Sequence, residues 1–208
     1  MNRIMLESEF FPILVILFLG VALWLLHIGV QNHYLLSLDQ KAAEWFHSIR
    51  NHRLDDFFST VTWMGSLWIL LPLYIAIILV FQHDNTSLEK SLGIAFFGTI
   101  VTTYALKYML NRPRPHLYAM IEEVPLDPSF PSAHSAQIAA FSLGILLAVH
   151  HNAGLLTVMT IVLGSVCLLV FMSRMYLQVH FLTDVLSGIL VALIWGVISY
   201  SIVRKGGI

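Results

Sequence analysis

Apolar residues in this chain come in six long runs separated by more polar stretches. A bilayer core of roughly 30 Å is crossed by about 20 helical residues, and each run is that long or nearly so. In lipid the backbone groups find partners only within the chain, so each run is expected to be a helix. The runs are Phe11–Val30, Val61–Phe81, Leu92–Leu110, Ala136–Val149, Leu156–Met172 and Val185–Val203. This pattern predicts an all-α fold, a six-transmembrane-helix bundle.

Two of these runs need a further argument. The fourth is short as written, and we expect it to begin earlier, with its first turn at the polar residues Ser132–His134. The first could be a cleaved signal peptide. Its leader carries Glu7 and Glu9, its apolar run exceeds a typical signal core, and no small-x-small site follows. We therefore interpret it as a membrane span.

The connection between the first two runs, Gln31–Thr60, mixes aromatic with charged residues. That mixture is typical of helices that lie in the membrane interface, and one or two interfacial helices are expected here. They either hold the rim of the bundle or guide the substrate. The chain shows neither an internal repeat nor a flexible linker, so we expect a single integral membrane domain over residues 1–208.

Composition agrees with a membrane protein. Hydrophobic residues make up 58% and charged residues 11%, with a mean hydropathy of +0.80, whereas about 25% of an average soluble domain is charged. The formal net charge is −1, so the chain has no excess of basic residues for binding a nucleic acid. The expected partner is the bilayer. With Cys167 as its one cysteine, the chain cannot form an intrachain disulfide.

Three polar clusters stand at the ends of apolar runs. They are Lys107-x6-Arg114-Pro115, Pro131-Ser132-Ala133-His134 and Ser173-Arg174-x5-His180-x3-Asp184. Because successive runs cross in alternate directions, all three clusters should meet on the same side. Phosphoryl transfer needs fixed positive charge, a nucleophile and an acid for the leaving oxygen, and the clusters contain a candidate for each.

The chemistry of each cluster supports this interpretation. Arg114 offers a planar fork for two phosphate oxygens, and Lys107 adds a compact charge. Ser132 is a plausible N-cap, and free N–H groups at a helix N-terminus bind anions. His180 and Asp184 are four residues apart, so on a helix the carboxylate can hold one ring nitrogen protonated and leave the other as a nucleophile.

The three clusters match the motifs of the type 2 phosphatidic acid phosphatase superfamily, so the chain resembles a membrane lipid phosphate phosphatase. The resemblance covers Lys107 to Asp184, with one departure, because Ala133 stands where the second motif usually has glycine. That methyl group crowds the phosphate cradle but keeps the backbone N–H.

The resemblance implies a role for each motif residue. His180 would be the nucleophile and form a phosphohistidine, oriented by Asp184, while His134 would be the general acid. Phosphate would be bound by Lys107, Arg114, Ser132, Ala133 and Arg174. The implied substrate is a lipid monophosphate or diphosphate, with undecaprenyl diphosphate or phosphatidylglycerol phosphate favoured. The implied reaction needs neither cofactor nor metal.

Charge does not orient the protein in the membrane. Outside the motifs, Arg3, Lys90, Arg204 and Lys205 face one side, while Lys41, Arg50, Arg53 and Arg112 face the other. The positive-inside rule therefore gives a tie. It is the resemblance that implies a bacterial cytoplasmic membrane with the active site on the extracytoplasmic side. The oligomeric state is left open.

Several residues near the motifs receive simpler interpretations. Arg112 is expected to reach toward lipid headgroups, as cations at span ends commonly do. Three acidic residues of the loop that carries Arg114 are expected to be solvated; these are Glu122, Glu123 and Asp127. Ser173 is expected to be structural. Tyr176, Thr183 and Gln137 flank motif residues and are candidates for a supporting role by proximity alone.

Two alternatives remain at this stage. A metal site is a competing use of His180 and Asp184, but the clusters hold few carboxylates and many cations, the wrong balance for a divalent ion. A six-helix transporter or channel without hydrolytic activity is the alternative of a different class, and it should carry ionisable residues at mid-membrane depth. Haloperoxidases of the same superfamily share the motifs. They are soluble proteins, however, whereas the six apolar runs predict a membrane protein.

Overall fold

The computed structural model of the chain describes residues 3–81, 86–121 and 125–205. All regular elements in these residues are helices, which confirms the all-α prediction. The α-helices are α1 (Arg3–Gln31), α2 (Leu36–Ser48), α3 (His52–Val61), α4 (Leu67–Phe81), α5 (Thr86–Leu110), α6 (Ala133–Val149), α7 (Ala153–Tyr176) and α8 (Leu182–Lys205). A short 3-10 helix, η1 (Thr62–Gly65), lies between α3 and α4.

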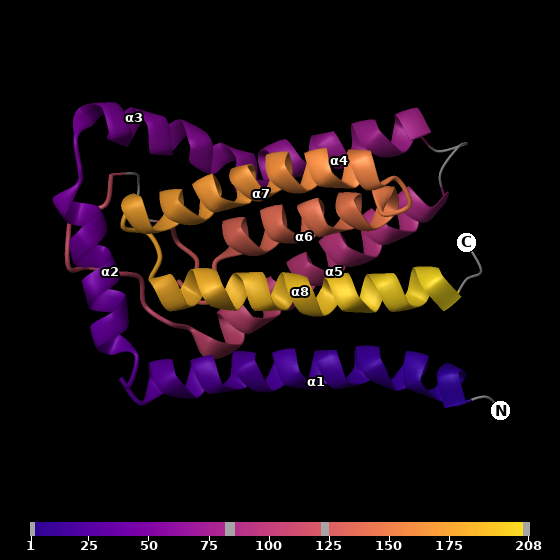
Figure 1. Cartoon of the computed structure of the whole chain (residues 1–208). Coiled ribbons are helices and arrows are strands. Elements are labelled where there is room, and N and C mark those ends of the chain that lie inside the picture. Colours follow the sequence, from indigo (N-terminus) through magenta and orange to yellow (C-terminus); the bar gives the residue numbers. More distant parts are fainter. Residues whose placement is uncertain (1–2, 82–85, 122–124, 206–208) are drawn as a thin grey trace.

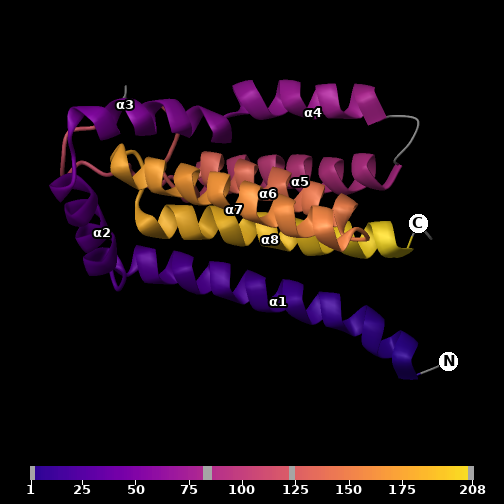
Figure 2. The same ribbon diagram turned by 45° about the horizontal axis from the view of Figure 1, so that its top comes forward.

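The long helices run side by side, and α2 lies across one end of them (Figure 1). Helices α5, α6 and α8 pack against one another, with α7 against α6 and α1 along α8. Turned by 45°, the bundle shows α3 and α4 along one flank and α1 along the opposite flank (Figure 2). The bundle is therefore built around α5, α6 and α8.

The number of helices that are long and apolar enough to span a membrane is lower than the six expected from the sequence. Within the described residues, four helical segments are long and apolar enough to cross a membrane: Phe10–Gln31, Leu88–Leu110, Ala153–Tyr176 and Leu182–Arg204. A fifth is obtained if His52–Gly65 and Leu67–Phe81, bent by 44°, count as one broken span. Helix α6 is apolar but only 17 residues long. It begins at Ala133, close to the start expected from the sequence.

The second expected span, Val61–Phe81, is not one helix. The chain leaves η1 through Ser66, whose backbone is extended, before α4 begins. A Cβ atom on Gly65 would lie 2.7 Å from a methyl carbon of Val170 and 3.0 Å from the carbonyl oxygen of His134. The backbone thus approaches α7 and α6 more closely than a side chain allows, and the bend lies at this contact.

The two helices expected in the interface differ in direction. Helix α2 crosses the end of the bundle, whereas α3 runs on toward α4 (Figure 1). The connections α1–α2, α5–α6 and α7–α8 all lie at the end where α2 crosses. The three polar clusters are therefore at one end of the bundle, as the alternation of the apolar runs requires.

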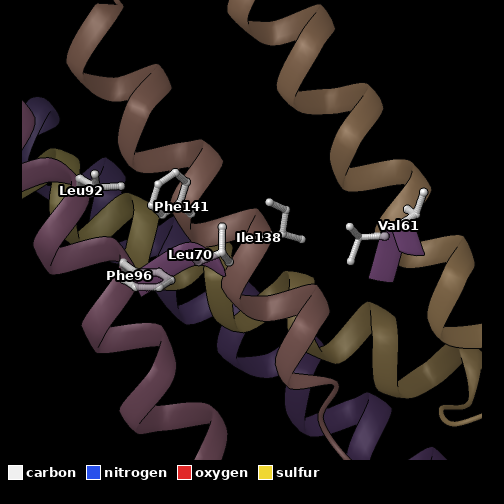
Figure 3. Packing of buried hydrophobic residues seen from close by; sticks show 7 residues of the cluster. Val61, Leu70, Leu92, Phe96, Ile138 and Phe141 are labelled. Atoms are coloured by element: carbon white, nitrogen blue, oxygen red, sulfur yellow. The ribbon is translucent and has the colours of Figure 1, made fainter. Parts of the chain in front are cut away.

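Apolar side chains fill the bundle where α4, α5, α6 and α7 meet, and Figure 3 shows this packing. The buried cluster consists of Val61, Leu70, Leu92, Phe96, Ile138, Phe141 and Val170. On the outer face of α1, large apolar side chains such as Phe11, Phe18 and Trp24 are more than half exposed. Such a continuous exposed apolar face is typical of a helix that contacts lipid.

Candidate active site

Helix α5 ends so that Lys107 lies in its last turn and Arg114 in the loop beyond it. The backbone of Asn111 has a φ of 44°, in the left-handed region that asparagine tolerates, and its N–H donates to the Lys107 carbonyl over 2.9 Å. The chain then leaves the helix through Pro113 and Pro115. Both cations are buried, with 0% of the Lys107 and 7% of the Arg114 side chain exposed.

The start of α6 is held against the start of α8. Ser132 is the N-cap of α6, as expected, and its hydroxyl accepts from the N–H of Ser135 over 3.5 Å. Its own N–H donates to the carbonyl of Asp184 over 3.0 Å. A Cβ atom on Gly188 would come within 2.6 Å of the Ser132 carbonyl oxygen. This glycine lets the second and third motifs meet.

His180 is buried between a carboxylate and a cation. Its Nδ1 lies 3.5 Å from Oδ2 of Asp184 and 3.3 Å from the hydroxyl of Ser129. That same carboxylate oxygen accepts from the Ser129 hydroxyl and, over 2.9 Å, from the N–H of Phe181. On the other side of the ring, Nε2 lies 3.3 Å from Nη1 of Arg114. The two ring nitrogens therefore have different surroundings.

The imidazole of His180 favours the neutral form. Burial lowers its pKa well below the usual value, and the nearby cations Arg174, Lys107 and Arg114 lower it further. With Asp184 facing Nδ1, the proton of the neutral ring is best placed on Nδ1. This leaves a lone pair on Nε2, which faces Arg114.

Arg174 and His134 reach the same region from α7 and α6. Arg174 lies in the last turn of α7, is only 3% exposed and donates to the hydroxyl of Thr62 in η1. Both residues line a cavity of about 1010 Å³. The other lining residues are Thr62, Trp63, Ser66, Leu67, Trp68, Leu71, Tyr104, Pro125, Leu126 and Gln137. The cavity thus joins polar site residues to apolar residues of η1 and α4.

The expectation that Arg112 reaches toward headgroups is wrong. Its guanidinium group lies between two buried carboxylates, with Nη1 donating to Asp184 and Nη2 donating to Asp39 over 2.7 Å. Only 11% of its side chain is exposed. Asp39 belongs to α2, far away in the sequence, and supplies the second negative charge that draws Arg112 inward.

Thr183 joins the same network. Its N–H donates to Asp39 Oδ1 over 3.0 Å, and its hydroxyl donates to Asp39 Oδ2 over 2.8 Å. Arg112 also donates to that hydroxyl over 2.7 Å. Asp39 thus fixes the first turn of α8, which carries Asp184. Nothing in the sequence marks Asp39, because an acidic residue on a short helix is usually solvated.

The expectation that Asp127 is solvated is also wrong. Its carboxylate lies 2.8 Å from the amine of Lys107 and 2.7 Å from Nη2 of Arg114, with 27% of the side chain exposed. Glu122 and Glu123, for which solvation was expected as well, lie outside the described residues.

The remaining flanking residues have different roles. The hydroxyl of Tyr176 donates to Asp55 over 2.7 Å and therefore ties α7 to α3. Gln137 lines the cavity beside His134. The Ser173 hydroxyl donates to the carbonyl of Val170 over 2.6 Å, the structural role expected for it. Among the described residues, no three His, Cys, Asp or Glu side chains are grouped so that they could hold a metal ion.

Comparison with known proteins gives consistent matches. Residues 89–207 match the family model of the PAP2 superfamily. Phosphatidylglycerophosphatase B of Bacillus subtilis (strain 168) is 28% identical over 169 residues, which cover 79% of this chain and 82% of that protein.

Two crystal structures are also similar. One is described as the first transmembrane PAP2 type phosphatidylglycerolphosphate phosphatase, from Bacillus subtilis. It matches with a TM-score of 0.77 and 26% identity over 94% of this chain and 95% of its own. The other, LpxE of Aquifex aeolicus, matches with a TM-score of 0.66 and 27% identity, over 79% of this chain and 95% of its own.

Proposed function

The chain belongs to the PAP2 superfamily, and on that premise we propose that it is an integral membrane lipid phosphatase of a bacterial membrane. It hydrolyses the terminal phosphate of a lipid monophosphate or diphosphate. His180 is the nucleophile, Asp184 orients it, and His134 is the general acid. Lys107, Arg114, Arg174 and the start of α6 at Ser132 and Ala133 bind the phosphate.

One observation carries this proposal: His180 presents Nδ1 to Asp184, 3.5 Å away, and Nε2 to Arg114, 3.3 Å away. A phosphate held on the arginine fork is then beside the ring nitrogen that has the lone pair. Asp184 stabilises the positive charge that develops on the ring during attack. Its own position is fixed by Arg112, Ser129 and the N–H of Phe181.

The first step transfers the phosphoryl group to the enzyme. Nε2 of His180 forms a bond to phosphorus while the bond from phosphorus to the lipid oxygen breaks. His134 gives a proton to that departing oxygen. The charge on the three remaining phosphate oxygens is stabilised by Lys107, Arg114 and Arg174, and by N–H groups at the start of α6.

The second step regenerates the enzyme. Water attacks the phosphohistidine, and the deprotonated His134 takes up a proton from that water, the reverse of its first task. The bond from Nε2 of His180 to phosphorus breaks, and inorganic phosphate leaves. The chain needs neither a cofactor nor a metal for this sequence, because its cations supply the positive charge.

The lipid tail is accommodated in the cavity of about 1010 Å³. His134 and Arg174 lie on its lining, together with Trp68, whose side chain is 80% exposed at the outer surface of the bundle. A tail can therefore extend from the polar site toward surrounding lipid. Undecaprenyl diphosphate and phosphatidylglycerol phosphate are the favoured substrates, and the similarity to phosphatidylglycerophosphatase B supports the second of them.

The finer architecture belongs to the same proposal. The broken pair α3–α4 and the short helix α6 join the four long helices to make six spans in one domain over residues 1–208. Helix α2 lies in the interface across the active-site end, which faces the extracytoplasmic side of the membrane.

A phosphate-release panel on the purified protein tests the function. The substrates are undecaprenyl diphosphate, phosphatidylglycerol phosphate, phosphatidic acid and lipid A, each with and without chelator. We expect release from at least one lipid phosphate, and none from the His180→Ala variant. Absence of release from every substrate by the folded wild-type protein would contradict the proposal.

A further inference from the structure

The carboxylate of Asp127 bridges the two cations that the proposed function assigns to the substrate phosphate. Oδ2 lies 2.8 Å from Nζ of Lys107, and Oδ1 lies 2.7 Å from Nη2 of Arg114. The same guanidinium group places Nη1 3.3 Å from Nε2 of His180. An anion that spans Lys107 and Arg114 is therefore already present beside the nucleophile.

The main chain around Asp127 is held to the same pair of cations. Nε of Arg114 donates to the Asp127 carbonyl over 3.0 Å, and Nζ of Lys107 donates to the Pro128 carbonyl. The two residues before Asp127, Pro125 and Leu126, line the large cavity, and the Leu126 side chain is fully exposed. Residues of this loop thus contact both cations and also line the cavity.

Electrostatics explains why this contact forms. Lys107 and Arg114 are buried, and buried cations without a counter-charge are costly. Burial alone would raise the pKa of the Asp127 carboxyl, but contacts with Lys107 and Arg114 outweigh this and lower the pKa. The group is therefore an anion throughout the neutral range. A carboxylate and a phosphate offer similar pairs of oxygens to an arginine fork, and two anions on the same pair of cations repel each other.

We propose that Asp127 is an intramolecular competitor of the substrate phosphate, occupying Lys107 and Arg114 in the free enzyme and leaving them when the phosphate binds. This inference rests on the proposed function. If Asp127 holds the cations in about nine molecules of ten, it weakens the binding of any phosphate about tenfold. A lipid substrate compensates through contacts of its tail in the cavity, which inorganic phosphate lacks. The competitor thereby favours lipid phosphates and helps the phosphate product to leave.

The test is the affinity of the full-length protein for inorganic phosphate, measured by titration calorimetry in detergent. Asp127→Asn keeps the shape of the side chain and removes its charge, so we expect it to bind phosphate about tenfold more tightly than the wild type. Asp56→Asn is the matched control, because it makes the same change in net charge at an exposed position of α3. It should leave phosphate affinity unchanged.

Each contrary result has a distinct meaning. Weaker or unchanged phosphate binding by Asp127→Asn would overturn the inference and leave Asp127 as a support that positions Lys107 and Arg114. Absence of phosphate binding in both proteins would overturn the phosphate role of Lys107 and Arg114 in the proposed function, and the inference with it.

A second measurement uses the wild-type protein and does not depend on the folding of a variant. A water-soluble carbodiimide with an amine labels accessible carboxylates, and mass spectrometry gives the labelled fraction of Asp127. Saturating inorganic phosphate should increase this labelling, because Asp127 is released from its ion pairs. Unchanged or lower labelling, with Asp56 as the internal reference, would overturn the proposed competition.

Discussion

The two histidines of the site differ in what surrounds them. Nδ1 of His180 faces Asp184, while His134 stands in the first turn of α6 and lines the cavity. A nucleophile needs a lone pair beside the phosphate, whereas an acid needs access to the departing oxygen. The surroundings support His180 as the nucleophile and His134 as the acid.

Removal of either histidine should therefore affect different substrates differently. We expect His134→Ala to lose activity on a lipid phosphate but to regain part of it on an aryl phosphate, whose leaving group departs without a proton. We expect His180→Ala to stay inactive on both, since no leaving group replaces a nucleophile. The measurement is release of the leaving group in the first turnover by both variants, after their folding is confirmed, because the second step, which releases phosphate, also uses His134. Selective recovery of His180→Ala would show that the two roles are reversed.

The sequence predicts single residues well where the chemistry is contained in a motif. His180 and Asp184 are in contact, as predicted, but His180 precedes α8, which begins at Leu182, so they do not share a helix face as the spacing argument assumed. The position of Ser132 predicted an N-cap. The sequence failed for Arg112 and Asp127, because their partners are set by tertiary contacts. Arg112 is drawn inward by Asp39 of α2, and Asp127 is held by Lys107 and Arg114. A local pattern contains no information about such distant partners.

Helix α2 connects through two side chains to Asp184, the carboxylate that we propose orients the nucleophile. Asp39 is 1% exposed and binds both Thr183 and Arg112, and Arg112 binds Asp184. Helix α2 therefore positions the first turn of α8 from across the end of the bundle. Of the two roles considered for the connection between the first two apolar runs, this favours holding the rim of the bundle over guiding the substrate.

Loss of the Asp39 charge should lower turnover more than substrate binding. In Asp39→Asn we expect kcat to fall about tenfold or more, because partners of a catalytic group fix its orientation, while KM changes much less. Breaking a buried ion pair also costs about 3–5 kcal/mol of stability, so thermal unfolding is followed in parallel. Lys41→Gln, at an exposed position of the same helix, is the control. A large rise in KM with kcat retained would contradict this positioning role.

The contact between α6 and α8 depends on a glycine. A Cβ atom on Gly188 would lie 2.6 Å from the Ser132 carbonyl oxygen and 3.1 Å from the Ala136 nitrogen, both backbone atoms that cannot rotate away. A side chain at position 188 would therefore displace the start of α6, which we propose binds the phosphate.

We therefore expect Gly188→Ala to reduce kcat/KM by about tenfold or more, equivalent to about 1.4 kcal/mol of barrier. Gly164→Ala makes the same change in α7, where a Cβ atom would meet nothing within 4 Å, and should keep wild-type activity. The measurement is phosphate release from a lipid phosphate by both variants. Equal activity of the two would show that the close approach at Ser132 does not matter for catalysis.

Element boundaries were predictable where the apolar pattern and helix signals coincide, as at the start of α6. The pattern failed at Val61–Phe81, where apolar residues continue through a bend. The bend lies where Gly65 closely approaches Val170 and His134, which is a tertiary contact. Hydrophobicity alone cannot distinguish a straight span from two helices joined at such a contact.

The molecule gathers its site residues at one end of an apolar bundle, where α2 crosses (Figure 1). A transporter would be expected to carry ionisable residues at mid-depth. The site instead joins the ends of α5 and α7 to the starts of α6 and α8, which suits a lipid phosphatase whose substrate has a polar end and a long tail.

If cations of the chain supply the charge that a metal would otherwise supply, as we propose, activity should survive chelation. We expect phosphate release to be unchanged in EDTA. The measurement compares initial rates before and after dialysis against the chelator. Loss of turnover that one divalent ion restores would reject the metal-independent mechanism.

Locating the phosphoryl group on the enzyme shows whether His180 carries it. His134→Ala should accept phosphate from an aryl phosphate and hydrolyse the intermediate slowly, because the base for the second step is missing. Rapid denaturation at alkaline pH followed by mass spectrometry of peptides should find the phosphate on His180. Phosphate on any other residue, or none while aryl phosphate is still cleaved, would show that His180 is not the nucleophile.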